Sequence, residues 1–234
     1  MPYGTPILIM LTNRFSITLA TLCILLPSAW AASVSLTPGS SVTPGNNDGT
    51  FNPNTGAVGY TEVAIASGVI GPPALSVTGV ERVYRNNNAC LGGAIGCGGE
   101  LQFFVQLVNT GADSLKTIDV TNFLGYQTSV GYINLGGESD PNSADRGVAG
   151  DVVNFNFLNG SNQGTLMGTS DWLEIDTNAT TFAETGTVGF IDGGAYSITA
   201  YAPTGVPEPA TTGMVGAALA LMVLVARRRL PNKA

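Results

Sequence analysis

The 234-residue sequence contains no histidine and only three cysteines, and these shortages restrict the chemistry that it can support. Without histidine, nucleophilic systems of the Ser-His-Asp and Cys-His kinds cannot form, and the commonest zinc sites lose their main ligand. Charged residues make up 11% of the chain, and Lys116 is the one lysine between residues 32 and 205. The sequence therefore predicts a protein that is not an enzyme and that holds no cofactor.

Positive charge is also scarce in the central part of the chain. Residues 32–205 contain 15 acidic side chains against four basic ones, Arg82, Arg85, Lys116 and Arg146, which gives a net charge of about −11 at neutral pH. A polyanion such as nucleic acid would be repelled by this surface, so we expect no nucleic-acid partner. Divalent cations or cationic material would be attracted.

Long hydrophobic runs occur only near the two ends. Arg14 precedes the apolar stretch 15–26, and the small residues Ala29 and Ala31 stand at the minus-three and minus-one positions of the expected cleavage. A positive start, a short apolar core and an Ala-Trp-Ala ending are typical of a secretion signal, which predicts cleavage between Ala31 and Ala32. Residues 1–9 precede a signal of ordinary length, so Met10 is the expected true start.

The C-terminal tail has three parts in a fixed order. Pro207, Glu208 and Pro209 come first, the apolar run 210–226 follows, and the basic cluster Arg227, Arg228 and Arg229 ends it. The prolines disfavour a helix, whereas 17 apolar residues form a helix of about 25 Å, close to the hydrocarbon thickness of a membrane. Arginines at the far end predict that this end stays in the cytoplasm and that the body faces outward.

This order of residues resembles the PEP-CTERM sorting domain. The resemblance implies that exosortase, a membrane protease and transpeptidase of Gram-negative bacteria, recognises Pro207, Glu208 and Pro209, with residues 210–226 as the transmembrane segment. It implies that the protein is exported, is held transiently in the inner membrane, and then reaches the cell surface or the medium. It also links the protein to extracellular polysaccharide and biofilm.

The predicted organisation is therefore a signal peptide at 1–31, one extracytoplasmic domain at 32–205, and a sorting signal at 206–230. After export the domain keeps two cysteines, Cys90 and Cys97, which flank a glycine-rich loop. In an oxidising compartment they are expected to form a disulfide. A metal site is the alternative, but two cysteines in a chain without histidine cannot complete a zinc shell without carboxylates.

The central region is predicted to be all-β, because apolar and polar residues alternate in short segments bounded by turn residues. Leu101, Phe103, Val105 and Leu107 alternate with polar or aromatic neighbours, and Val153, Phe155 and Phe157 alternate with asparagines. An antiparallel β-sandwich of about ten short strands is expected, with a partly closed barrel as the alternative. The predicted strands are 33–36, 59–66, 75–84, 101–109, 116–122, 127–133, 151–157, 172–176, 187–191 and 195–202.

Two segments lack this alternation. Residues 37–55 are rich in proline, glycine and asparagine and are expected to form a loop or flexible lead-in. Residues 202–209 are expected to form a short linker between the domain and the membrane.

Two groups of oxygen-bearing side chains are candidates for chemistry. Asp171, Glu174 and Asp176 surround Trp172, and two carboxylates can hydrolyse a glycosidic bond. A solvated strand face is the simpler interpretation, with Glu174 and Asp176 on one face while Asp171 and Trp172 point differently. The loop residues Asp140, Asn142 and Asp145 form a weak calcium candidate, with an ordinary acidic turn as the alternative.

Three classes of function follow from these observations. The first is a structural or adhesive envelope protein sorted by exosortase. The second is a glycan-binding module that uses exposed aromatics, with Tyr126, Tyr132 and Trp172 as candidates. A carboxylate-dependent glycoside hydrolase is the third, and the missing catalytic groups disfavour it.

Overall fold

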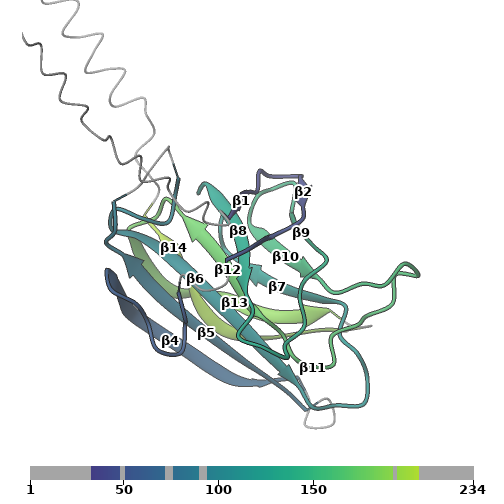
Figure 1. The fold of residues 1–234 in the computed structure, drawn as a ribbon. Helices are drawn as coiled ribbons and strands as arrows, with labels where there is room; N and C mark the ends of the chain where they lie inside the picture. The colour runs from purple at the N-terminus through teal and green to yellow at the C-terminus, as the bar shows by residue number, and fades with distance from the viewer. Residues whose placement is uncertain (1–32, 48–50, 72–75, 90–93, 192–193, 206–234) are drawn as a thin grey trace, which may run out of the picture.

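The computed structural model describes residues 33–47, 51–71, 76–89, 94–191 and 194–205. These residues form fourteen strands and no helix, arranged as two packed sheets (Figure 1). The predicted signal peptide and nearly all of the sorting signal lie outside the described residues. Within them, no helix is long and apolar enough to cross a membrane. The all-β prediction is confirmed for this part of the chain.

The first sheet contains eight strands, and its main path runs in the order β1-β8-β12-β6-β5-β4. All of its pairings are antiparallel except that of β3 with β8. The strands are β1 Val34–Ser35, β3 Gly45–Asn46, β4 Tyr60–Ile70, β5 Val77–Asn86, β6 Glu100–Asn109, β8 Thr128–Ile133, β11 Gly168–Thr169 and β12 Trp172–Thr177.

The second sheet contains six strands in the order β14-β13-β7-β10-β9-β2, all antiparallel. Its strands are β2 Ser41–Val42, β7 Thr117–Thr121, β9 Ser143–Arg146, β10 Val152–Asn156, β13 Thr181–Ile191 and β14 Ala195–Thr204. Each of the ten predicted strands has a counterpart in one of the two sheets. The four strands that were not predicted, β2, β3, β9 and β11, have two to four residues, too few to show a periodic pattern.

The main core lies between the sheets and contains the alternating residues predicted from the sequence. Phe103, Val105 and Leu107 of β6 are fully buried, as are Val153 and Phe155 of β10. The asparagines that alternate with them on β10 are half-buried. The buried faces predicted for β6 and β10 are therefore confirmed.

The outer face of the first sheet is buried as well, which the sequence analysis did not predict. Phe104 is 0% exposed and Gln102 is 6% exposed, although both point away from the main core. Residues from the region 33–60 cover them: the Phe51 ring lies 4.9 Å from the Phe104 ring, and Asn47 hydrogen-bonds to Glu174 on the same face. The prediction of a loose segment at 37–55 is wrong in part, because it contains β2, β3 and the buried Phe51.

Arg146, at the end of β9, joins several loops at one end of the molecule. The side chain is 3% exposed, and its guanidinium donates to the carbonyl oxygens of Phe123, Tyr126, Leu36 and Gly150 at 2.7 to 3.2 Å. Burial lowers its pKa, and the Asp151 charge opposes that change. A planar guanidinium can satisfy several carbonyls from different segments at once, so one side chain fixes the loop arrangement.

β14 ends at Thr204, so the expected linker at 202–209 is wrong at its beginning. Ala202 and Pro203 are buried, and both pair with β13. The hydroxyl of Tyr126 donates to the carbonyl oxygen of Gly205. The folded domain therefore extends to the residue that precedes the tail.

Candidate functional site

The segment that crosses the outer face of the first sheet carries a group of stacked aromatic rings. Phe51 lies with its ring centroid 4.4 Å from that of Tyr60 and 4.7 Å from that of Tyr84, in stacked and edge-on geometry respectively. Phe104 of β6 contacts Phe51 from the sheet, and Trp172 and Ile133 pack in the same cluster. Paired rings in these geometries add to the stability gained by burial, so the segment is firmly attached to the sheet.

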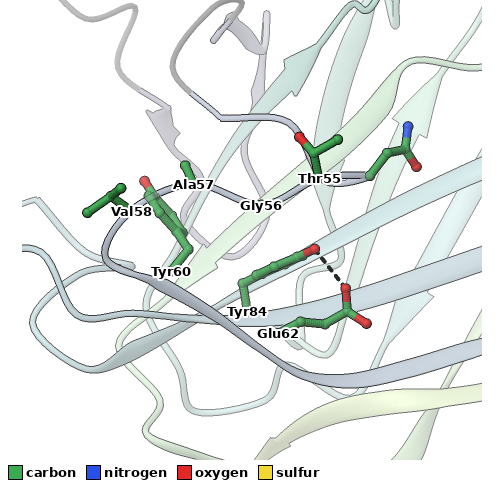
Figure 2. A pocket seen from close by; sticks show the side chains of 8 residues that line it. Thr55, Gly56, Ala57, Val58, Tyr60, Glu62 and Tyr84 are labelled. Carbon is green, nitrogen blue, oxygen red and sulfur yellow. Dashed lines mark hydrogen bonds between the residues drawn. The ribbon is translucent and has the colours of Figure 1, made fainter.

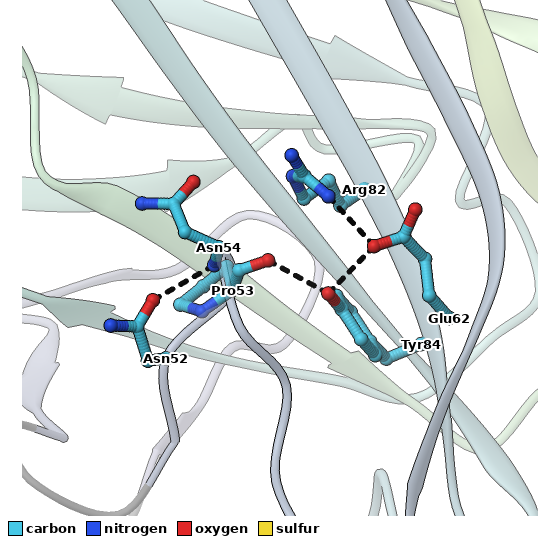
Figure 3. A network of polar contacts seen from close by, with 6 residues as sticks. All are labelled: Asn52, Pro53, Asn54, Glu62, Arg82 and Tyr84. Atoms are coloured by element: carbon cyan, nitrogen blue, oxygen red, sulfur yellow. Dashed lines mark hydrogen bonds and ion pairs between the residues drawn. The ribbon is translucent and has the colours of Figure 1, made fainter.

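A chain of polar contacts begins beside these rings (Figure 3). The Tyr84 hydroxyl lies 2.7 Å from the Pro53 carbonyl oxygen and 2.8 Å from a Glu62 carboxylate oxygen. Arg82 donates to the same Glu62 oxygen at 2.7 Å and forms an ion pair with it. Burial, together with the hydrogen bond and charge of Glu62, raises the pKa of Tyr84 to about 12, although Arg82 opposes the change. The phenol therefore stays protonated and acts as a hydrogen-bond donor.

An open hollow of about 440 Å³ lies beside this network (Figure 2). Its floor carries Tyr60, Glu62 and Tyr84, and its wall is the loop 54–58. Val58 in this wall is 96% exposed. The aromatic ring of a tyrosine can stack on the apolar face of a ligand ring. The neighbouring carboxylate can accept hydrogen bonds from ligand hydroxyl groups, and the phenol can donate hydrogen bonds to them.

A second polar cluster lies on the same outer face but is completely covered. Glu174 and Asp176 are 5% and 2% exposed and project from β12 beside Gln102 of β6. The Gln102 amide nitrogen lies 2.6 Å from an Asp176 oxygen and 3.2 Å from a Glu174 oxygen. Ser129 donates to Asp176 at 3.1 Å, and two residues of the covering segment, Ser33 and Asn47, donate to Asp176 and Glu174 respectively.

The two carboxyl groups influence each other and their surroundings. Burial raises the pKa of Glu174 well above its usual value, and the Asp176 charge raises it further. Burial also raises the pKa of Asp176, although its hydrogen bonds with Ser33, Gln102 and others oppose that change. Burial raises the pKa of Tyr60 to about 12, with the charges of both carboxylates as a further cause. Burial therefore favours the protonated, uncharged forms of these two acids, and their hydrogen-bond partners in the described part of the chain include no basic side chain.

The structure corrects the interpretation of this group as a solvated strand face. Asp171 is 0% exposed and Trp172 is 2% exposed, so neither they nor the two acids face solvent. Trp172 also shares its face with Glu174 and Asp176, because these residues alternate along β12. The burial could not be predicted because the sequence does not show that residues 33–60 cover this sheet, whereas the shared face of Trp172 follows from alternation along the strand alone.

The proposed aromatic platform is also not exposed. Tyr126 is 7% exposed and belongs to the main core, Tyr132 is half-buried and packs against that core, and Trp172 is buried. The sequence analysis missed Tyr60, Glu62 and Tyr84 as a surface group. Tyr60 and Glu62 are two positions apart on β4, a spacing that indicates a shared strand face, but their closeness to Tyr84 depends on strand pairing.

The calcium candidates are each bonded to other side chains or to the backbone. Asp140 accepts from Asn134 at 2.9 Å, Asn142 accepts from the Leu158 amide at 2.6 Å, and Asp145 of β9 accepts from Asn154 and Asn156 at 2.8 and 2.7 Å. Calcium binding by these residues stays a prediction.

Cys97 is buried, whereas Cys90 lies outside the described residues, so the predicted disulfide also stays a prediction. Residues Ala31 and Ala32 of the expected signal cleavage, and the sorting residues Pro207 to Arg229, lie outside them too.

Comparison with known proteins identifies the tail. The family model of the PEP-CTERM protein-sorting motif matches residues 205–229. No curated protein and no solved structure gives a significant match to the chain. The motif begins at Gly205, one residue after the end of β14. The chain thus carries a PEP-CTERM protein-sorting motif at its C-terminal tail, the mark of an extracellular protein sorted by exosortase.

Proposed function

We propose that this chain is a structural or adhesive protein of the cell envelope or extracellular matrix, displayed as a folded β-sandwich after exosortase processes its tail. The observation that carries the proposal is the direct junction between β14, which ends at Thr204, and the sorting motif, which begins at Gly205. With so short a connection, the folded domain is held next to the membrane surface until the tail is processed. Processing of the tail makes this attachment to the membrane transient and leaves the domain on the outer surface.

A structural role agrees with the way the acidic groups are placed. Glu174 and Asp176, the strongest pair for glycoside chemistry, are covered by residues 33–47 and engaged by amide and hydroxyl donors. A carboxylate-dependent glycoside hydrolase needs two accessible carboxyl groups on either side of the glycosidic bond. We therefore propose a function without catalytic turnover.

The test compares cells that produce the complete chain with cells that produce a form ending at Gly205. We expect the complete chain to be retained in the polysaccharide matrix and its loss to weaken cell cohesion, whereas the truncated form should be found free in the medium. Equal retention of both forms would contradict sorting-dependent display. Hydrolysis of a matrix polysaccharide by the purified protein, lost in an Asp171, Glu174 and Asp176 triple alanine variant that still folds, would contradict the non-enzymatic role.

Glycan binding is a second candidate function, and the hollow beside Tyr60, Glu62 and Tyr84 favours it. Extracellular polysaccharide is the corresponding partner. A glycan array with the purified protein should identify bound sugars. Tyr60→Ala should abolish the signal, whereas Tyr196→Ala should not, because Tyr196 is exposed on β14 and does not line the hollow. A signal that is unchanged in the Tyr60→Ala variant would exclude this hollow as the binding site.

A further inference from the structure

β4 is a long end strand without the features that usually protect a sheet edge. It forms one margin of the first sheet, and β5 is the one strand that pairs with it in the described part of the chain (Figure 1). Its other side therefore presents backbone N–H and C=O groups to which a further strand can be added. The 11 residues Tyr60–Ile70 contain one charged side chain, Glu62, and no proline or lysine.

The other end strands of the two described sheets are protected. β1 and β3, at the far side of the first sheet, and β2, at the far end of the second, have two residues each. β14, the remaining end strand, contains Pro203. Very short strands and prolines are common means of preventing edges from pairing. β4 is thus the exception among the sheet ends.

The regular part of β4 has its centre at Ser67. A register shift interrupts the pairing with β5 between Glu62 and Ala64, and Gly71, with a φ of 80°, follows the end of the strand. Between these limits, Ala64 to Ile70 pair with β5 residue by residue. Two copies of one strand that pair antiparallel are related by a twofold axis at the centre of the paired stretch. Use of the whole regular stretch therefore places the axis at Ser67.

This register brings exposed apolar side chains together. It sets Ile65 of each copy opposite Val69 of the other, with Ser67 opposite itself. Ile65 is 48% exposed and Val69 is 62% exposed. Both lie on the face opposite to Gly68, whose Cβ position would be 3.2 Å from Ile198 of the second sheet. Aliphatic side chains directly opposite each other on paired strands stabilise the pair, so the contact would cover the exposed apolar groups of this margin.

Charge favours a second copy over a charged partner at this edge. Residues 64–70 contain no ionisable side chain, and Glu62 is compensated by Arg82 at 2.7 Å. A strongly charged peptide would find no opposite charge along the edge. Two copies, each with a net charge of about −11 over residues 32–205, repel each other over most of their surface. The neutral edge is where they can approach with the least repulsion.

We propose that β4 is an assembly edge, at which two copies of this chain pair antiparallel through residues 64–70 about a twofold axis at Ser67. The first sheets of the two copies then form one continuous sheet. This pairing gives the proposed structural role a molecular contact. It depends on the folded domain and not on sorting, so failure of either proposal leaves the other intact.

Sedimentation velocity of the exported protein at increasing concentration measures the pairing. So short a contact lies below the standard interface size, and we expect a dissociation constant of about 10⁻⁵ to 10⁻³ M. Ser67→Lys should weaken dimerisation by at least about tenfold, because two like charges would meet at the axis. The matched control, Gln163→Lys, adds the same charge at an exposed position outside the strands and should dimerise like the wild type.

Cysteine crosslinking under non-reducing conditions tests the register separately, with the wild type as the reference. Ser67→Cys should form a disulfide-linked dimer. Ile65→Cys alone should not, because its two copies would lie about 13 Å apart along the strands, at about 3.3 Å per residue. A mixture of Ile65→Cys and Val69→Cys should form the mixed dimer. Ser197→Cys, on the exposed part of β14, should remain monomeric.

A protein that stays monomeric up to about 1 mM would overturn the proposal, since that concentration reaches the expected dissociation constant. Equal weakening by Ser67→Lys and Gln163→Lys would also overturn it, because the contact would then not involve β4. Crosslinking through Ser197→Cys but not through Ser67→Cys would overturn it in favour of β14. If Ser67→Lys does not fold, the crosslinking pattern decides alone.

Discussion

Gln102 and Asp176 face each other across β6 and β12, and the Gln102 amide donates a 2.6 Å hydrogen bond to the Asp176 carboxylate. This contact lies on the side of the first sheet that points away from the main core. The molecule therefore has a buried polar layer in addition to its apolar core. Residues 33–60 cover that layer, and its hydrogen bonds hold the covering segment in place.

Gln102→Ala should destabilise the fold by about 2 to 3 kcal/mol, because the change leaves two buried carboxyl groups without their shared donor. Chemical denaturation measures the loss. Gln163→Ala changes the same side chain at an exposed position and should cost less than about 0.5 kcal/mol. Equal losses of unfolding free energy in the two variants would show that the buried hydrogen bonds of Gln102 add no stability beyond that of an exposed glutamine.

Arg146→Lys should destabilise the fold by about 3 kcal/mol or more, because a single ammonium group cannot satisfy the carbonyls of Phe123, Tyr126 and Gly150 together. The free energy of unfolding in urea measures this cost. The control is Arg85→Lys, whose guanidinium bonds the carbonyls of Gly99 and Thr180 nearer to the surface. We expect a loss below about 1 kcal/mol there, and a similar loss at both sites would exclude the proposed role of Arg146.

Glu81→Gln should stabilise the protein near neutral pH. Glu81 is fully buried on β5, accepts a 2.6 Å hydrogen bond from the Tyr201 amide of β14, and has its pKa raised by burial to about 8. The folded pKa exceeds the unfolded value of 4.5, so the unfolded chain loses this proton first as the pH rises. Stability therefore falls between pH 4.5 and about 8, by up to about 1.4 kcal/mol per pH unit.

Glutamine keeps the acceptor for Tyr201 and carries no titrating proton, so the variant should lose this part of the pH dependence. Melting temperatures from pH 4 to 9 show the difference between the two proteins. Exposed Glu184→Gln serves as the control and should follow the wild type. A parallel pH profile for Glu81→Gln and the wild type would contradict the burial of an acid at this position.

Phe155→Ala should cost about 3 to 5 kcal/mol, because it leaves a cavity between the two sheets. Asn154→Ala, one residue away on the other face of β10, should cost no more than about 1 kcal/mol, since it removes one half-buried hydrogen bond to Asp145. Denaturant unfolding measures the loss of unfolding free energy in each variant, and the ratio of the two losses shows how differently the two faces of β10 are buried. Comparable losses would mean that the register of β10 is different.

Glu208→Ala should leave the chain unprocessed and membrane-bound when it is produced together with exosortase, because the change removes the central residue of the Pro-Glu-Pro triplet within the matched sorting motif. Mass spectrometry of the mature C-terminus distinguishes the forms. Glu184→Ala, which lies in the folded domain, should be processed like the wild type. An intact tail on the wild-type protein in its native host would refute processing.

Local patterns in the sequence determined the ten main strands, the inward faces of β6 and β10, and the sorting motif. The reason is that side-chain alternation along a strand is a nearest-neighbour property, and the motif consists of adjacent residues. The same alternation misled the interpretation of β12: polar residues at 174 and 176 resemble a solvent face whether or not another segment covers them.

Only the tertiary structure decided what lies above the outer face of the first sheet. Placement of Phe51 on Phe104, and of Asn47 and Ser33 on the two acids, joins residues up to 143 positions apart. No short-range pattern contains such pairings, since they depend on the order of strands in the sheet and on the path of the covering segment. The sequence thus determined the sorting motif and the ten main strands, and tertiary packing decided which polar groups are buried together.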